Sequence, residues 1–257
     1  MSTDTIAVLE RALGVMRLLA LRPEGYSVPE LVAESGMSKS TVRRFLQALT
    51  KQGFVDFDGE RQRYTLGMLL LGLATGISQH NVLAVAVHPA LESLQRSTNE
   101  TVALWLRVRL SALCLSSIES TQFVRTVSPI GRSIPLYASA HSKLLLAGLT
   151  EQELGDYLDT AELVPLTSAT ITDRTLLRAE VARAREVGFA VSHGEVNDDV
   201  TGVAAPVFDP AGRIIACLSA TAPSHRVDDK RLDQLCADVQ TAAAEATRRI
   251  SGSGVRD

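Results

Sequence analysis

The stretch "SVPELVAESGMSKSTVRRFLQALTKQGFVDFDGERQRYTLG", residues 27–67, decides the fold of the N-terminal part of this 257-residue chain. It opens with a capping box, in which Ser27 is the N-cap and Glu30 follows three residues later. The short helix that this box starts ends at Gly36, and a second helix begins at once with Ser38 as its N-cap. Two helices joined by such a tight, glycine-containing turn are typical of a helix-turn-helix.

A β-hairpin is predicted directly after these helices. Apolar and polar residues alternate over residues 55–66, and the Asp-Gly pair at 58–59 is a strong signal for a hairpin turn. Arg61 and Arg63 lie two positions apart, so on one strand their side chains would share a face. The hairpin therefore reads as a basic wing beside the helix-turn-helix.

The second helix carries an uneven distribution of charge. The chain has a net charge of −3, yet residues 35–55 contain four basic side chains and no acidic one. On a helix over residues 39–52 one buried stripe is formed by Val42, Phe45, Leu46 and Leu49. The opposite face carries Ser40, Arg44, Gln47 and Lys51, with Arg43 on its flank. Taken alone, such a run of basic residues is a solvated surface about as often as it is a binding face.

The helix-turn-helix context favours DNA as the partner of this face. A helix reached through a tight turn can lie in the major groove, where arginine suits guanine, glutamine suits adenine, and lysine or hydroxyl groups suit phosphates. The candidate DNA contacts in this part of the chain are Ser38, Lys39, Ser40, Thr41, Arg43, Arg44, Gln47, Arg61 and Arg63. We expect a symmetric pair of such heads, because one recognition helix covers too few base pairs to be selective.

The remaining sequence predicts a second domain. Residues 67–98 are mostly helical, with a break expected around residues 78–81, and from Thr101 strands and helices interleave around a mainly antiparallel sheet. The fold class is α+β. We expect a winged helix-turn-helix over 1–66, a linker helix over 67–80, an effector-binding domain over 81–250 and a flexible tail over 251–257.

Several classes of protein are disfavoured by composition. The apolar run 66–77 is too short to span a bilayer, which takes about 20 residues, and no signal peptide precedes it. Three separated cysteines form no CxxC pair and no metal-ligand spacing with the histidines, so we expect a cytoplasmic protein without metal or cofactor. An enzyme remains the alternative, because "AHSK" places Ser142 beside His141 and Lys143, although no GxSxG, GxGxxG or P-loop motif is present.

The motifs together resemble one known family. The pattern "ERAL…L…G…SVPELVAESGMSKSTVRRFLQALTKQGFV…YTLG" is similar to the winged helix-turn-helix of IclR-type bacterial transcriptional regulators. "PLYASAHSKLLLA" and "GFAVSHGE…TGVAAPVFDPAGRIIACLSATAPSHR" resemble the second domain of that family. The resemblance implies a GAF-like effector domain, dimers that are often paired into tetramers, and DNA contacts by Arg11 and Arg44. It implies a ligand-responsive regulator of transcription, with repression as the expected sign.

The same resemblance implies where a small polar or aromatic organic effector would bind. Motif matching assigns to its pocket His141, Ser142, Asp198, Asp199, Ser219 and Thr221, and Pro206 stands where one type in the family has a pocket cysteine. Ser219 and Thr221 also lie two apart in an apolar strand, so both hydroxyls face one side and need partners. Those partners could equally be neighbouring backbone groups. Asp198 and Asp199 could equally be an exposed loop pair. For Trp105 the sequence favours a role in the core over a role as a stacking platform.

Overall fold

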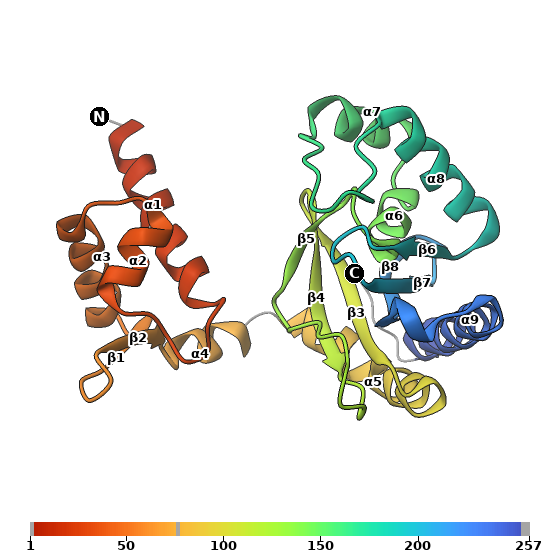
Figure 1. Cartoon of the computed structure of the whole chain (residues 1–257), viewed down its shortest axis with the longest axis horizontal. Coiled ribbons are helices and arrows are strands. Elements are labelled where there is room, and N and C mark those ends of the chain that lie inside the picture. Colours follow the sequence, from red (N-terminus) through yellow and green to blue (C-terminus); the bar gives the residue numbers. More distant parts are fainter. Residues whose placement is uncertain (1–2, 76–77, 253–257) are drawn as a thin grey trace. The chain divides into compact units, whose positions relative to one another are not determined.

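The chain divides between Ser78 and Gln79 into two compact units. The computed structural model describes residues 3–75 and 78–252 (Figure 1). We call residues 3–75 the head and residues 79–252 the sheet unit, and each is described by itself. No helix within these described ranges is long and apolar enough to cross a membrane.

Three helices and a hairpin form the head. The helices are α1 (Thr3–Leu19), α2 (Val28–Ser35) and α3 (Lys39–Lys51). The predicted capping box is present, because the Ser27 hydroxyl accepts from the Glu30 N–H while the Glu30 carboxylate accepts from the Ser27 N–H. Gly36 makes the turn between α2 and α3 with φ of 65°, a left-handed conformation that glycine adopts without strain. The predicted helix-turn-helix is therefore confirmed.

The wing differs from the prediction at one point. It consists of β1 (Val55–Asp58) and β2 (Arg63–Leu66), paired antiparallel with Asp58 opposite Arg63. Arg61 lies in the connecting turn, and Gln62 has a positive φ of 54°. The expectation that Arg61 and Arg63 share one face of a strand is wrong, because the chain regains extended geometry only at Arg63.

A small apolar core holds the head together. Its buried members come from all three helices, the loop before α2 and the wing: Val15, Leu19, Tyr26, Leu31, Val42, Phe45, Leu46 and Val55. Tyr26 is also tied to Tyr64 of the wing by a pair of backbone hydrogen bonds. The predicted apolar stripe of α3 is thus its buried side, and the polar side is left facing solvent.

Two helices follow the wing. They are α4 (Leu69–Thr75) and α5 (Ser78–Thr98), and residues 76–77 lie outside the described residues. The break expected around 78–81 is not present, because α5 runs continuously from Ser78. At the other end of the chain the last helix, α9 (Asp229–Gly252), includes the first two residues of the predicted tail, and 253–257 lie outside the described residues.

A six-stranded antiparallel sheet organises the second unit. Its spatial order is β5-β4-β3-β8-β7-β6. In chain order the strands are β3 (Thr101–Val108), β4 (Ser111–Ile118), β5 (Ser133–Pro135), β6 (Ala190–His193), β7 (Val200–Phe208) and β8 (Ile214–Pro223). The central pair, β3 and β8, places Thr101 opposite Thr221 and Ala103 opposite Ser219. The predicted α+β class with an antiparallel sheet is confirmed.

Helices cover both faces of this sheet (Figure 1). One face packs against α6 (Ala140–Ala147), α7 (Glu151–Thr160) and α8 (Arg174–Val187), and its core includes Trp105 and Cys217. The other face packs against α5 and α9, and its core includes Leu218 and Ala220. Alternate residues of β8 therefore enter different cores, as the period of a strand requires.

Candidate DNA-binding face and effector cavity

The exposed side of α3 carries positive charge that the head does not neutralise. Lys39, Arg43, Arg44 and Lys51 are all exposed, while Val42, Phe45 and Leu46 are buried beneath them. Within the described ranges none of these four basic side chains forms an ion pair with a carboxylate. By contrast Arg22 pairs with Glu30 and Glu34. The face of α3 therefore offers unpaired donors to a partner outside the chain.

The start of α3 presents a cluster of hydroxyl groups. Ser38 caps the helix by accepting the Thr41 N–H at 3.3 Å, and its Oγ lies 3.0 Å from the Ser40 hydroxyl and 2.9 Å from the Thr41 hydroxyl. Arg11 of α1 lines an open groove together with Ser38 and Thr41. The structure thus brings the predicted Arg11 to the N-terminal end of α3, although the two are nearly thirty positions apart in the sequence.

The two wing arginines differ in their surroundings. The side chain of Arg61 is 79% exposed and lies 3.8 Å from the Asp58 carboxylate at the hairpin turn. Arg63 instead donates to the Gly25 carbonyl and pairs with Glu30 at 3.1 Å. Hydrogen bonds from Ser27, and then Arg63, lower the pKa of the Glu30 carboxyl to about 2. Arg63 therefore joins the wing to the start of α2, whereas Arg61 is left for solvent.

The sheet unit contains a small cavity between β3, β7, β8 and the start of α6. Its volume is about 50 Å³, several times the space that one water molecule needs. Three of the predicted effector residues line it, namely His141, Ser219 and Thr221. Apolar walls come from Val127, Ile134, Val196, Val200 and Val203. The combination of apolar walls with a few inward polar groups is typical of a small-molecule site.

One wall of the cavity is a stacked pair of rings. The Trp105 and His141 rings lie 3.9 Å apart between centroids and 9° from parallel. The Trp105 indole N–H donates to the Ser219 hydroxyl at 3.0 Å. Burial, together with the positive charge of Arg132, lowers the pKa of His141 to about 3, so its imidazole is neutral near pH 7. Trp105 is therefore a core residue, as expected, and it stacks on His141. Ser219 has a side chain as its partner, whereas the Thr221 hydroxyl donates to the backbone carbonyl of Thr101 at 3.4 Å.

The start of α6 is held in an uncommon backbone conformation. Ser139, the N-cap of α6, has φ of 91° and ψ of 162°, a region that residues other than glycine adopt at a cost of about 1–3 kcal/mol. Its N–H donates to Glu195 at 2.9 Å, and its hydroxyl lies 3.0 Å from His141 Nε2 and 3.1 Å from the Ser142 hydroxyl. These contacts explain how the conformation persists. They also engage the hydroxyl of Ser142, which was expected to meet a ligand.

Charge inside the cavity is only partly balanced. Lys143 is buried and pairs with the buried Glu195 at 2.7 Å, while it also donates to the Val191 carbonyl at 3.1 Å. Their charges cancel within the protein. Arg132 also lines the cavity, and its guanidinium reaches only the Val127 carbonyl, at 3.4 Å, with no carboxylate partner among the described residues. The cavity therefore keeps one uncompensated positive charge.

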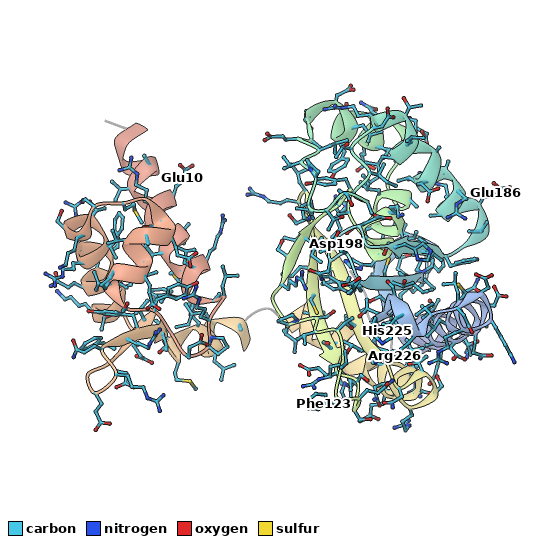
Figure 2. All side chains as sticks on the ribbon, viewed as in Figure 1. Glu10, Phe123, Glu186, Asp198, His225 and Arg226 are labelled. Atoms are coloured by element: carbon cyan, nitrogen blue, oxygen red, sulfur yellow. The ribbon has the colours of Figure 1, made fainter. Side chains whose placement is uncertain are left out.

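The other predicted effector residues do not line this cavity. Asp198 and Asp199 are both exposed in the turn between β6 and β7, in line with the loop-pair alternative; Asp198 is labelled in Figure 2. Pro206 is buried in β7 opposite Cys217. Ser142 is buried beside the cavity with its hydroxyl bonded to Ser139.

Several cavity residues were missed by the sequence analysis, namely Thr126, Arg132, Ser139 and Glu195. Only Ser139 carried a signal in the sequence, as the hydroxyl residue one position before a short apolar helix. The other three reach the cavity through long-range packing. In the described ranges no group of three His, Cys, Asp or Glu side chains could hold a metal ion.

Comparison with known proteins decides the family. The IclR helix-turn-helix domain matches residues 8–59, and the C-terminal domain of the bacterial transcriptional regulator IclR matches residues 74–248. The chain belongs to the IclR family. The IclR-type resemblance predicted from the sequence is confirmed, and the protein is a DNA-binding transcriptional regulator rather than an enzyme.

Named relatives and a solved structure agree with the IclR assignment. The regulator KdgR of Escherichia coli is 32% identical over 96% of this chain and 94% of its own length. The transcriptional repressor IclR of E. coli is 28% identical over 98% of this chain and 92% of its own. An IclR homologue of Microbacterium hydrocarbonoxydans, solved in complex with 4-hydroxybenzoate, superposes with a TM-score of 0.77 at 21% identity, covering 95% of this chain and 98% of that one. At that identity it shows the fold.

The buried His141 predicts a pH-dependent stability of the sheet unit. Its folded pKa, about 3, lies below the usual 6.5, so between these values the unfolded chain binds the extra proton and stability falls as pH falls. From pH 6.5 to 5 the loss from this residue amounts to about 2 kcal/mol. Urea unfolding followed by circular dichroism should show this loss in the wild type, and a smaller one in His141→Gln. Equal losses in both proteins would contradict the assignment.

Proposed function

We propose that this regulator binds a near-palindromic operator as a symmetric dimer, with α3 of each copy in the major groove. The observation that carries the proposal is the unpaired basic face of α3. Buried Val42, Phe45 and Leu46 fix the helix from behind, so Arg43, Arg44 and Gln47 are directed outward from a rigid element. Rigid presentation of arginine and glutamine suits base edges, while the hydroxyl cluster at Ser38 suits phosphates.

A small polar or aromatic organic molecule in the cavity is the proposed effector. The uncompensated charge of Arg132 favours a ligand with an anionic or strongly polar group, and the valine and isoleucine walls favour an apolar body. The Trp105–His141 stack offers a flat surface to a ring. The 4-hydroxybenzoate complex of the Microbacterium homologue makes aromatic acids the first compounds to try. Repression is the proposed sign, supported by the named repressor among the relatives.

Arg44→Ala should remove specific operator binding without unfolding the head, because its side chain is exposed opposite the buried stripe. We expect a loss of about 1–3 kcal/mol per half-site. A duplex selected by the wild-type protein from a random pool provides the operator for a gel-shift titration. The control is Arg183→Ala, which removes the same charge from an exposed position of α8 and should leave affinity unchanged. Wild-type affinity of the Arg44 variant would refute the proposal.

The two wing arginines should respond differently to substitution. Arg61→Ala should reduce the slope of log affinity against log salt by about one, since an exposed wing arginine meets phosphates. Arg63→Ala should mainly lower the melting temperature of the head, because it removes the contacts to Gly25 and Glu30. Titrations at several salt concentrations, together with thermal unfolding, separate the two effects. An equal change of slope in both variants would count against these roles.

A thermal-shift screen of aromatic acids, sugar acids and small keto acids should yield a stabilising compound. At 100 times its dissociation constant a ligand adds about 2.7 kcal/mol of stability. Replacing Ser219 by Ala and Thr221 by Val together should preserve operator binding but abolish the effect of that compound on it. The matched control is Ser117→Ala on β4, whose hydroxyl has no partner in the described structure. Unchanged potency in the double variant would place the effector site elsewhere.

A further inference from the structure

The segment between β4 and β5, residues 119–132, contacts both the cavity and the end of α5, and we call it the strap. At one end Thr126, Val127, Ser128 and Arg132 line the cavity. The Thr126 Oγ1 lies 2.8 Å from the Oγ1 of Thr221 on β8. This hydroxyl pair is part of the cavity wall, so a polar ligand atom placed there would compete for it.

At its other end the strap contacts Asn99 and Glu100, the two residues that follow α5. The Ser120 hydroxyl donates to the Asn99 carbonyl at 2.7 Å, and the Thr121 hydroxyl donates to the Asn99 side-chain oxygen at 2.8 Å. The Gln122 amide donates to the Asn99 carbonyl at 3.2 Å and to Glu100 at 3.4 Å. Asn99 has a positive φ of 51° while its N–H still donates to the Gln95 carbonyl. The strap thus contacts α5 where the helix turns into β3.

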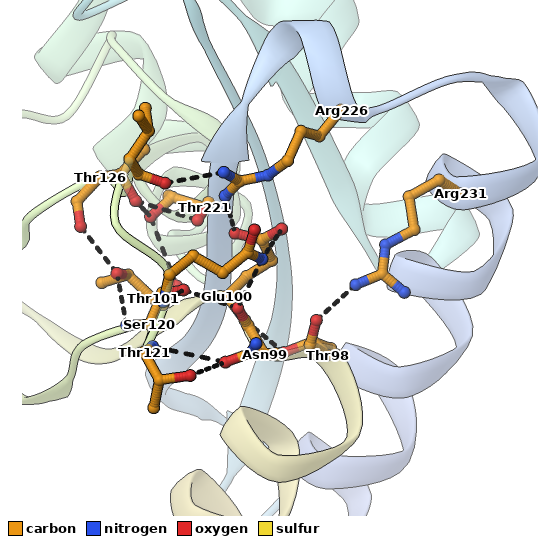
Figure 3. A network of polar contacts seen from close by, with 12 residues as sticks. Thr98, Asn99, Glu100, Thr101, Ser120, Thr121, Thr126, Thr221, Arg226 and Arg231 are labelled. Atoms are coloured by element: carbon orange, nitrogen blue, oxygen red, sulfur yellow. Dashed lines mark hydrogen bonds and ion pairs between the residues drawn. The ribbon is translucent and has the colours of Figure 1, made fainter.

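Two cross-links connect these ends into one network (Figure 3). The buried Glu100 pairs with Arg226 at 2.7 Å, and the same guanidinium donates to the strap carbonyl of Val124 at 2.7 Å. The Thr101 hydroxyl donates to the Thr126 carbonyl, also at 2.7 Å. The hydrogen bonds therefore form a continuous path from the cavity wall to α5.

The outward side of the strap is loosely packed. Phe123 is 97% exposed (Figure 2), and Val124, Val127 and Ile130 are exposed as well. Arg125 pairs with Glu119 of the same segment. A segment with few buried apolar contacts and many polar ones opens at low free-energy cost. The strap can therefore shift while the sheet beneath it stays intact.

We propose that the strap relays the state of the cavity wall to the C-terminal end of α5. The Thr126 hydroxyl also donates to the Thr221 carbonyl at 2.9 Å, so a ligand that takes the Thr221 hydroxyl removes one of the two contacts between the Thr126 hydroxyl and β8. The strap, held less firmly there, then shifts while Ser120, Thr121 and Gln122 remain attached to Asn99 and Glu100. In the chain α5 is the helix of the sheet unit that follows the head. A shift of the strap therefore reaches this helix at its C-terminal end. The inference rests on the proposed effector cavity, and the strap residues act as positioning residues.

A double-mutant cycle on the full-length protein tests the relay without ligand or DNA. Thr126→Val removes the hydroxyl at the cavity wall, and Thr121→Val with Gln122→Ala removes attachments at the helix end. Hydrogen exchange of the amides at residues 97–100 is the readout, because these comprise the last two residues of α5 and the two residues that join it to β3. We expect Thr126→Val to speed this exchange about five-fold, the size of a coupling between contacting residues. In the Thr121–Gln122 variant the same change should add nothing.

Two further variants keep the result interpretable. Thr126→Ser keeps the hydroxyl and should exchange as the wild type does, which separates the hydroxyl contact from general loosening. Arg125→Gln removes only the contact to Glu119 within the strap and should have no effect. The relay is overturned if Thr126→Val leaves residues 97–100 unchanged, or speeds them by the same factor in both backgrounds. A failure of every compound in the thermal-shift screen would refute the effector proposal and leave this measurement valid.

Discussion

The pairing of β3 with β8 is the contact on which the sheet unit depends. These strands are more than a hundred residues apart in the chain, yet their register sets Thr101 against Thr221 and Ala103 against Ser219. Because the period of a strand is two, a slip of one residue would turn Ser219 and Thr221 toward α5 and α9 and bring Leu218 into the cavity. The same register places Trp105 where its indole meets Ser219, and it brings the end of α5 beside the cavity wall.

Local patterns were enough to predict most of the head. The capping box at Ser27, the N-cap at Ser38 and the stripe of Val42, Phe45 and Leu46 are all encoded within a few residues of where they act. Arg61 is the exception. The hairpin turn extends through Gln62, which has a left-handed backbone, so the alternation of the strand does not include Arg61. The side chain of Arg63 could not be placed from the sequence, because its partners, Gly25 and Glu30, come from another element.

The cavity was predictable from spacing only where its residues share a strand, and His141 was found only through the family motif. Ser219 and Thr221 were assigned to one face by spacing, and the structure bears this out. Arg132, Thr126 and Glu195 come from segments whose position depends on tertiary packing, and no local spacing signals them. The buried Lys143–Glu195 pair is a further case. Removing one partner of such a pair typically costs 3–5 kcal/mol, although neither residue stands out in the sequence. Ser139 persists in its strained conformation through contacts to the same Glu195.

The position of Trp105 has a spectroscopic consequence. It is the sole tryptophan of the chain, it is buried, and one side of its ring is covered by a neutral imidazole while its N–H is bonded to a hydroxyl of the cavity wall. Light absorbed selectively by tryptophan is therefore re-emitted from the wall of the cavity and from nowhere else in the molecule. The protein carries a single, native optical probe of this site, and its emission reports on the local polarity and stacking without any label.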